Sequence, residues 1–428
     1  MKSLAVVGAG IGGCSAAYFA SKYLPDTKVT IYDFQERVGG RILTHKAAGI
    51  NLELGAAFIS GTNKTILGIV KIEQLKLKRI EDRGNFAIWN GSELIFRSNQ
   101  KAALTNLKLL SQYKLSTVRT LLLLNEAKGQ VAKLYREEMK NPADTDELFE
   151  SAGLSKWYTK PFDEILLEKG ISRTFIDEIA TPITRTIYSQ NADLGGFAGI
   201  SSFIGVYGGP IYSLAEGNST LPAHIAEASQ ATIKRGQKVT SIEKTSEGAY
   251  RVSAGADAAL FDGVIVAAPL EIAGIEFDGI EKPNFLPQSY PKVYTKVMAG
   301  VFNPRYFGLN ESTKPPAIVL TTKDADPITH CSIQKIGKSE SFVTFSSTEP
   351  IADGAFSGIF KNKGVPVLQH CWTAAYPKFK PIAKLPPSRL DEWLIYVNSI
   401  EPSVSSMETS ALSALNAVKM IRNDLTLK

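Results

Sequence analysis

The segment LAVVGAGIGGCSAAYF, residues 4–19, sets four glycines between an apolar run and an alanine-rich run. Residues 3–7 predict a buried strand, residues 12–23 predict a helix, and KVTIYD at 28–33 predicts a second strand. A strand, a glycine turn, a helix and a second strand together form one βαβ unit of nucleotide-binding architecture. We therefore expect an α/β fold built on a Rossmann-like parallel sheet.

The glycines follow the spacing G-x-G-x-x-G, in which each has its own physical role. Gly8 permits a tight turn after the strand, Gly10 lets the backbone approach a pyrophosphate, and Gly13 lets the helix pack closely on the strand. Gly12 lies in the same turn, and the N-terminus of the helix offers unpaired N–H groups to the anion. Asp33 closes the second strand about 20 residues on, where a carboxylate binds a ribose hydroxyl. A solvated strand end is the alternative interpretation of Asp33.

The composition bounds the class of protein. The 428 residues are 44% hydrophobic and 21% charged, which is typical of a globular chain long enough for two domains. The 48 basic and 42 acidic residues are spread along the chain, so the net charge of +6 forms no block that would bind nucleic acid. No apolar run reaches the ~18 residues of a membrane span.

The cysteines and histidines give no sign of a metal site or a disulfide framework. Cys14, Cys331 and Cys371 lie far apart without a C-x-x-C spacing, so we expect buried free thiols. The histidines are equally isolated and show no metal-ligand spacing. They are His45, His224, His330 and His370.

The cellular compartment is open between two readings. A strand that begins almost at Met1 leaves no room for a secretory signal, which predicts a cytoplasmic protein if Met1 is the true start. Four N-x-S/T sequons favour instead a lumenal protein whose leader is missing from the numbering. The sequon asparagines are Asn63, Asn90, Asn218 and Asn310.

The pattern along the chain changes several times. Residues from about 101 to 190 predict helices, with leucines near helical spacing. Residues 286–372 hold several predicted strands, and the last segment predicts a strand, a loop and a long helix. The domains therefore interleave. We predict a nucleotide-binding domain of residues 1–75, 205–285 and 373–428, and a mixed-sheet and helical substrate domain of residues 76–204 and 286–372.

The segment DFQERVGGRILTH, residues 33–45, distinguishes FAD from NAD as the nucleotide. Its Gly39-Gly40-Arg41 turn has no general use in an NAD-binding domain, and it resembles the signature of the flavin amine oxidase and GDI-like superfamily. The resemblance implies a GR2-type FAD-binding domain, in which Arg41 beside Gly40 supports the FAD pyrophosphate.

Two further segments resemble motifs of that superfamily. NLELGAAFIS, residues 51–60, would place Glu53, Gly55 and Ala56 beside the isoalloxazine ring or its tail. A charge at a strand edge is the alternative for Glu53. Val239 matches the position whose backbone meets adenine.

The segment IEPSVSSMETSALSALNAV, residues 400–418, resembles the closing FAD motif of the superfamily. Glu401 precedes a small-residue loop, which leads through Ser406, Met407 and Glu408 into a helix. In the superfamily the N-terminus of this helix abuts the pyrimidine ring of the flavin, where its donors stabilise negative charge at N1 and O2. A purely structural helix is the alternative, but the agreement between both ends of the chain favours an FAD cofactor.

Within the superfamily the chain most resembles the prenylcysteine oxidase, or prenylcysteine lyase, family. The resemblance rests on VVGAGIGGCSAAYF, TRTIYSQN, YSLAEGNSTLPAHIAEAS, CWTAAYPKFKP and the closing motif, and it is poor over about residues 65–170. It implies an FAD-dependent oxidase that cleaves S-prenyl-L-cysteine with molecular oxygen to cysteine, a prenyl aldehyde and hydrogen peroxide. It also implies the lumen of a lysosome or vacuole.

This reaction asks little of acids and bases. The C1 carbon of the prenyl group lies between sulfur and an alkene, so hydride loss leaves a cation stabilised from both sides, and the protein need only orient C1 and exclude water. We therefore expect no catalytic triad. Lys296 matches the position at which amine oxidases of this fold hold a water at flavin N5, and a lysine on the surface of a strand is the alternative.

A prenyl chain requires a long apolar tunnel, because each buried CH₂ contributes ~0.8 kcal/mol. The leucine-rich helical segment and GISSFIGVYGGPIYS, residues 199–213, are the candidates for its walls. Phe203, Tyr207 and Tyr212 line the tunnel in one interpretation and belong to an ordinary core in the other.

Three questions about partners and activity stay open. The basic, leucine-bearing residues 101–124 either contact a membrane surface peripherally or form a bundle helix with a solvated basic face. The chain is either a thioether oxidase or an amine oxidase or desaturase of the same fold. A GDI-like carrier would bind prenyl groups without oxidising them, but it has no need for the glycine turn together with Asp33, Arg41 and Glu401.

Overall fold

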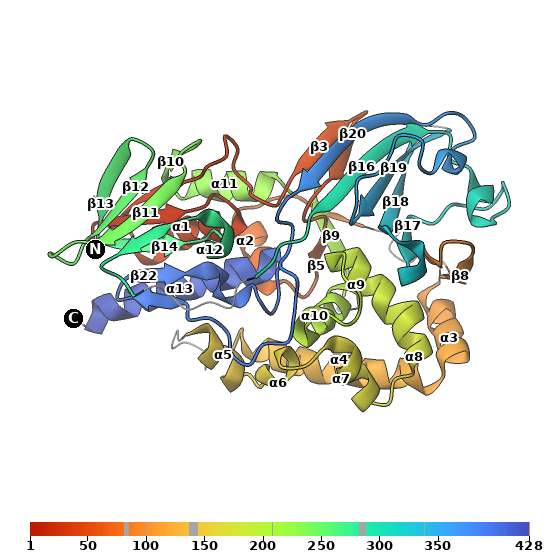
Figure 1. Cartoon of the computed structure of the whole chain (residues 1–428), viewed down its shortest axis with the longest axis horizontal. Coiled ribbons are helices and arrows are strands. Elements are labelled where there is room, and N and C mark those ends of the chain that lie inside the picture. Colours follow the sequence, from red (N-terminus) through yellow and green to blue (C-terminus); the bar gives the residue numbers. More distant parts are fainter. Residues whose placement is uncertain are drawn as a thin grey trace.

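Two bodies lie side by side in the computed structural model, one built on a parallel sheet and the other on a larger mixed sheet with helices beneath it (Figure 1). Both chain ends lie in the first body. The structure describes residues 1–80, 85–99, 101–136, 144–207, 209–281, 288–337 and 339–427.

Six strands form the sheet of the first body, in the order β10-β2-β1-β14-β22-β21. All pairings are parallel except that of β21 with β22. Leu4, Ala5 and Val6 of the central strand are fully buried, as expected of a parallel sheet covered on both faces. The strands are β1 (Ser3–Val7), β2 (Lys28–Tyr32), β10 (Thr232–Lys234), β14 (Gly263–Val266), β21 (Arg389–Asp391) and β22 (Leu394–Tyr396).

The two faces of this sheet are covered differently. α1 (Ile11–Tyr23) and α13 (Met407–Leu427) pack against each other on one face, with α11 (Thr220–Ala228) beside α1 (Figure 1). Because side chains alternate along a strand, Leu4 contacts these helices and Ala5 contacts a second sheet on the other face. That sheet has the order β13-β12-β11-β15, with β11 (Val239–Lys244), β12 (Tyr250–Ala254), β13 (Asp257–Phe261) and β15 (Glu276–Asp278), and α12 (Leu270–Ala273) precedes β15.

The second body has a seven-stranded sheet in the order β20-β16-β19-β18-β17-β7-β8. β17 pairs with β7 in parallel, and the other pairings are antiparallel. One face of the sheet buries Met298, Val343 and Phe345 in an apolar core. The strands are β7 (Phe86–Trp89), β8 (Leu94–Arg97), β16 (Val293–Gly300), β17 (Ile318–Thr321), β18 (Ile328–Ile336), β19 (Glu340–Ser347) and β20 (Val365–Trp372).

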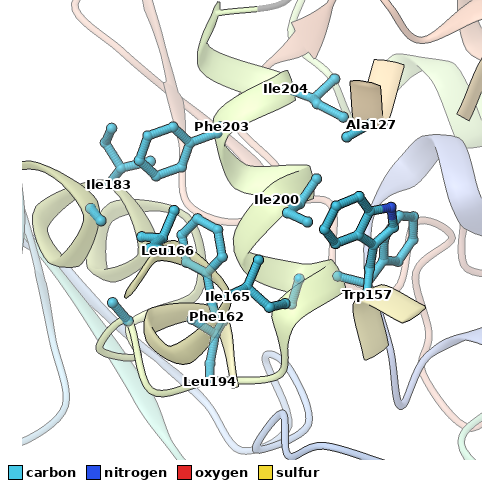
Figure 2. Packing of buried hydrophobic residues seen from close by; sticks show 14 of the residues in the cluster. Ala127, Trp157, Phe162, Ile165, Leu166, Ile183, Leu194, Ile200, Phe203 and Ile204 are labelled. Carbon is cyan, nitrogen blue, oxygen red and sulfur yellow. The ribbon is translucent and has the colours of Figure 1, made fainter. Parts of the chain in front are cut away.

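Helices fill the space below this sheet, around a core in which α10 is central. Gly199 lets α10 approach α7, since a Cβ at this position would lie 2.1 Å from the Phe162 ring. Phe162 and Phe203 meet edge to face at 5.4 Å between ring centroids (Figure 2). The helices are α3 (Ala102–Tyr113), α4 (Leu115–Lys133), α5 (Thr145–Ser151), α6 (Ser155–Tyr158), α7 (Phe162–Glu168), α8 (Arg173–Phe175), a π-helical turn (Ile176–Ala180), α9 (Thr181–Tyr188) and α10 (Gly196–Tyr207).

Smaller elements connect the two bodies. The hairpin of β3 (Thr44–Ala47) and β4 (Ile50–Glu53) follows the first βαβ unit, and α2 (Lys64–Ile72) packs on α13. A short sheet joins β5 (Ile59–Ser60), β9 (Ile211–Leu214) and β6 (Leu77–Arg79). Short 3₁₀ helices span Pro304–Phe307, Lys323–Ala325, Ser357–Ile359 and Val397–Ile400.

The predicted α/β fold class, a Rossmann-like domain interleaved with a mixed-sheet and helical domain, is confirmed. The parallel sheet takes its strands from three separate parts of the chain, as an interleaved fold requires. The domain limits themselves stay a prediction. The limit set between residues 204 and 205 falls inside α10, so the helical body continues to Tyr207.

Candidate active site

A cavity of about 1090 Å³ lies between the two bodies, lined by both chain ends and by the seven-stranded sheet. This volume slightly exceeds the usual range for small-molecule sites, so the cavity has room for a large cofactor. The predicted site residues that line it are Gly8, Gly10, Gly12, Asp33, Gly40, Arg41, Gly55, Ala56, Val239, Ser406 and Met407. Gly13 and Glu401 lie behind this lining.

The first glycine turn has the geometry that its spacing predicts. Gly8 has a φ of +106°, which favours glycine, and a Cβ there would lie 2.8 Å from the carbonyl oxygen of Ala267. A Cβ on Gly13 would lie 1.8 Å from the carbonyl oxygen of Gly8, so only glycine lets α1 pack this closely on the turn. Gly10 is the N-cap of α1 and provides no side-chain cap, which leaves the first N–H groups open toward the cavity.

The second glycine turn packs against the first. The backbone N–H of Gly39 donates to the carbonyl oxygen of Ala9 at 2.8 Å, and Gly39 forms a parallel bridge with Gly10. A Cβ on Gly40 would lie 2.9 Å from the Cα of Gly10. Two turns without side chains thus expose backbone to one region of the cavity, next to the positive end of the α1 dipole.

Asp33 lies at the end of β2, where it joins the glycine turn to the next segment. Its carboxylate accepts hydrogen bonds from the backbone N–H of Ala9 at 2.6 Å and of Gln35 at 2.7 Å. The side chain is 7% exposed and lines the cavity, and burial raises its pKa. A solvated strand end does not describe this position. A carboxylate held beside the phosphate turn suits a ribose hydroxyl.

Arg41 and Glu401 form an ion pair between segments that are far apart in the chain, in which Glu401 is buried and the Arg41 side chain is 31% exposed. The Arg41 guanidinium also donates to the carbonyl oxygen of Ala375 at 3.2 Å. Burial raises the pKa of Glu401, but Arg41 and hydrogen bonds from Asn398 and Ser405 outweigh burial and hold it below its usual value. Glu401 therefore fixes Arg41 at the edge of the cavity.

Glu53 lines the cavity at the end of β4 and organises the loop opposite. Its carboxylate accepts from the backbone N–H of Asn218 at 2.9 Å and from the Thr44 hydroxyl at 2.8 Å. The Asn218 amide donates in turn to the carbonyl oxygen of Ala56 at 2.9 Å. Gly55 has no room for a side chain, because a Cβ there would lie 2.1 Å from the carbonyl oxygen of Arg41.

The N-terminus of α13 faces the cavity through Ser406 and Met407. The Ser406 hydroxyl accepts from the N–H of Thr409 at 3.1 Å. Glu408 is 4% exposed and accepts from the first N–H groups of α2 and from the Tyr135 hydroxyl at 2.8 Å. This carboxylate therefore links α13 to both α2 and the helical body.

The prediction for Lys296 is wrong in both of its alternatives. The side chain is 1% exposed, so it is not on the surface, and it does not line the cavity. Its ammonium group donates to the carbonyl oxygen of Ile351 at 2.9 Å and to Asp353 at 2.7 Å on the far face of the sheet. The neighbouring Thr295 faces the cavity instead, because successive residues of β16 point to opposite faces.

The predicted apolar walls are only partly correct. α10 lines the cavity through Ser201, Ser202, Ile204 and Gly205. Six leucines of this segment face solvent instead, whereas Leu109 is buried in the helical core; the exposed ones are Leu104, Leu107, Leu110, Leu115, Leu121 and Leu122. Later residues, including Val131 and Leu134, line the cavity. Phe203, Tyr207 and Tyr212 belong to the apolar cores and not to the lining.

Several cavity residues escaped the sequence analysis. His330, Ser332, Thr344, Ser346 and His370 reach the cavity from the strands of the seven-stranded sheet. Their common position depends on the register between strands, which no local motif reveals.

The three cysteines are free thiols, as predicted. Cys14 and Cys331 are buried, whereas Cys371 is exposed and lines the cavity, so the prediction of burial is wrong for Cys371. Among the described residues, no three His, Cys, Asp or Glu side chains come together as metal ligands. Within the same ranges, no helix has both the length and the apolar character needed to cross a bilayer.

Sequence comparisons identify the family. The model of the prenylcysteine lyase family matches residues 96–428, which is most of the chain, and the model of the NAD(P)-binding Rossmann-like domain matches residues 6–71. The chain belongs to the prenylcysteine lyase family. The family predicted from the sequence motifs is therefore confirmed, and the predicted FAD-dependent oxidase agrees with it.

Two curated members of the prenylcysteine lyase family are similar over nearly the whole chain. Farnesylcysteine lyase of Arabidopsis thaliana is 28% identical over 98% of this chain and 88% of its own length. Prenylcysteine oxidase 1 of Bos taurus is 28% identical over 97% of this chain and 87% of its own length. Among solved structures, cyclohexylamine oxidase from Brevibacterium oxydans shares the fold, with a TM-score of 0.66, 14% identity and 99% coverage of both chains.

Proposed function

We propose that this chain is an FAD-dependent thioether oxidase that acts on S-prenyl-L-cysteine. One thioether, one O₂ and one water give one thiol, one aldehyde and one H₂O₂. The C1–S bond breaks, C1 is oxidised to the aldehyde, O₂ is reduced to H₂O₂, and water supplies the aldehyde oxygen. The products are cysteine, the prenyl aldehyde and hydrogen peroxide.

The observation that carries this proposal is one cavity in which both glycine turns, the N-terminus of α13 and the helical body meet. Membership of the prenylcysteine lyase family supports the substrate class. A cavity with bare backbone at one end and an apolar helical wall further along suits a dinucleotide beside a lipid-like substrate.

FAD, when bound, supplies the hydride acceptor at its ring and passes the electrons to O₂. The predicted site residues divide the work of holding it. Gly8, Gly10, Gly12 and Gly40 admit the pyrophosphate to the backbone, while Gly13 keeps α1 close behind them. The remaining predicted contacts are Asp33 to ribose, Val239 to adenine, Arg41 with Glu401 to the pyrophosphate, and Gly55, Ala56, Ser406 and Met407 to the flavin end.

The protein's other contribution is to orient C1 of the prenyl group and to exclude water. An amine oxidase or desaturase of the same fold would need a different substrate in the same cavity. A prenyl carrier without FAD is disfavoured, because the backbone is exposed at the very position where a pyrophosphate would bind.

The test is anaerobic reduction of the flavin by S-farnesyl-L-cysteine, followed by an aerobic assay of peroxide and cysteine. We expect the yellow flavin to bleach without air and equal amounts of peroxide and cysteine to form in air. Product analysis separates the alternatives, because only thioether cleavage releases cysteine. A flavin that stays oxidised with this substrate would contradict the proposal, and a colourless, flavin-free protein would favour a carrier.

We also propose that the outer face of α3 and α4 rests on an anionic lipid surface. Seven large apolar side chains on these two helices are between 39% and 63% exposed. Residues 101–124 carry four basic residues and no acidic one, so the face combines apolar and positive groups. The apolar residues are Leu104, Leu107, Leu110, Leu115, Val118, Leu121 and Leu122.

Sedimentation with lipid vesicles tests this surface. We expect the protein to bind vesicles that contain phosphatidylserine and to bind pure phosphatidylcholine weakly. The variant Leu107→Gln/Leu122→Gln should bind about tenfold more weakly, whereas Leu260→Gln/Val365→Gln, which changes exposed apolar residues elsewhere, should not. Equal binding by all variants would contradict the proposal, and a wild-type dimer that only the first variant splits would assign the face to a second copy.

A further inference from the structure

One wall of the cavity is a row of polar side chains across four strands. His330 on β18 is directly paired with Ser346 on β19, which is paired with Thr295 on β16, which is paired with His370 on β20. All four side chains line the cavity. Directly paired residues lie side by side on one face, so these four form a continuous stripe.

A second pair extends the stripe. Ser332 on β18 is paired with Thr344 on β19, and both line the cavity. Of the intervening residues on the far face, Val343 and Phe345 are buried in the apolar core, and Lys296 binds Ile351 and Asp353 there. The side of the sheet that faces the cavity therefore carries a stripe of polar residues, flanked by apolar residues such as Val293 and Ile318.

The wall formed by the helices is mainly apolar. It comes from the end of α4, from α5 and from α10, which place mainly aliphatic and aromatic side chains against the cavity, together with Ser201 and Ser202 of α10. The aliphatic and aromatic residues are Val131, Leu134, Phe149, Phe197 and Ile204. The cavity thus offers a polar wall and an apolar wall to the same ligand.

The two histidines of the polar wall have buried nitrogens without a partner. Nδ1 of His330 and Nε2 of His370 have no hydrogen-bond partner among the described residues. Burial lowers the pKa of His330 to about 4, so its imidazole is neutral near pH 7. An unpaired buried polar group is costly, and here it marks a wall whose hydrogen bonds are completed by a ligand.

We propose that the polar wall binds the amino-acid head of the substrate, while the apolar wall binds the prenyl chain. The polar wall comprises His330, Ser346, Thr295 and His370, with Ser332 and Thr344 beside them. This inference rests on the proposed function. The head of S-prenyl-L-cysteine is a zwitterion with no net charge. Neutral donors and acceptors are therefore sufficient, and the sheet residues that line the cavity include no Asp, Glu, Lys or Arg. The wall selects prenylcysteine over prenyl compounds without an amino-acid head.

The test compares two unreactive ligands on the FAD-loaded protein by isothermal titration calorimetry. S-dodecyl-L-cysteine has the head and a saturated chain, and dodecyl methyl sulfide has the chain and sulfur alone. His330→Phe and Thr344→Val should each bind S-dodecyl-L-cysteine about tenfold more weakly and bind the sulfide within about twofold of wild type. The control is His45→Phe on the exposed β3–β4 hairpin, which should change neither affinity.

The outcomes separate this inference from the proposed function. Equal losses for both ligands in the two wall variants, or no loss for either, would overturn the assignment of the polar wall while leaving thioether oxidation intact. If wild-type protein bound neither ligand and its flavin stayed oxidised with S-farnesyl-L-cysteine, the proposed function would fail and this inference with it.

Discussion

The guanidinium of Arg41 reaches a carboxylate 360 residues away, on Glu401, and this pair joins the two ends of the chain at the cavity. Such a pair adds little stability compared with apolar packing, but loss of Arg41 is costly because the buried Glu401 carboxylate is left without its counter-charge. The pair therefore positions Arg41 at the cavity more than it stabilises the fold.

Arg41→Ala should lower the free energy of unfolding by about 1–3 kcal/mol, because the buried Glu401 carboxylate loses its counter-charge but keeps its hydrogen bonds from Asn398 and Ser405. It should also lower the flavin content of the purified protein. Urea unfolding of the FAD-free protein measures the first effect without interference from cofactor loss. An unchanged urea midpoint would show that loss of the Arg41 charge does not destabilise the folded protein.

His330 should make the protein less stable in acid. Its pKa is about 4 in the folded protein, below the ordinary value of 6.5. Between these values the unfolded chain binds a proton that the folded protein does not, so stability is complete above about pH 6.5 and falls until about pH 4. The loss is at most about 3 kcal/mol.

Urea unfolding of wild type and His330→Asn at a series of pH values checks this prediction. The variant lacks the titrating group, so its stability should fall less between pH 6.5 and pH 4. Parallel pH dependences would mean that His330 titrates normally in the folded protein.

Two glycines of the same turn should respond differently to alanine, because one faces the protein and the other faces the cavity. A Cβ on Gly13 would lie 1.8 Å from a backbone oxygen, whereas a Cβ on Gly10 finds its nearest atom at 3.8 Å. Gly13→Ala should lower the free energy of unfolding by about 1–3 kcal/mol or more. Gly10→Ala should change it by no more than about 0.5 kcal/mol but weaken FAD binding at least about tenfold.

Denaturant unfolding of the FAD-free variants and FAD titration by flavin fluorescence separate the two effects. Equal FAD affinity for Gly10→Ala and wild type would place the pyrophosphate away from this turn.

Elements set by local patterns were predictable from the sequence. The glycine turns at Gly8 and Gly40 need bare backbone, and their spacing states this directly. The strand that carries Lys296 was also predicted, but the face of the sheet to which Lys296 points was not, because register decides which alternate residues face the cavity. The polar wall around His330 was missed for the same reason.

The leucines of α3 and α4 show another limit of sequence patterns. Their spacing predicts helices correctly, yet apolar spacing does not say what covers the apolar side. Leu107 and Leu122 face solvent, while Leu124 of the same run is buried. Only the packing of the neighbouring helices separates these positions.

At the scale of the whole molecule, bound FAD should stabilise the fold, since the cavity walls come from both bodies. A ligand that binds only the folded protein stabilises it by about 2.7 kcal/mol at a hundredfold excess over its Kd. The melting temperature should therefore rise steadily with added FAD. Differential scanning fluorimetry with FAD, and with AMP as a control that lacks the flavin end, measures the effect. A melting temperature independent of FAD would contradict a cavity shared by the two bodies.

The order of the strands along the chain also affects how the protein folds during synthesis. The helical body from α3 to α10 is contiguous in sequence, so its contacts can form as that part of the chain leaves the ribosome. The parallel sheet lacks β22 and β21 until residues 389–396 are made, and α1 lacks α13 until residues 407–427 emerge. Until α13 is made, the apolar side of α1 is therefore uncovered, and the nascent chain exposes surface that a chaperone can bind.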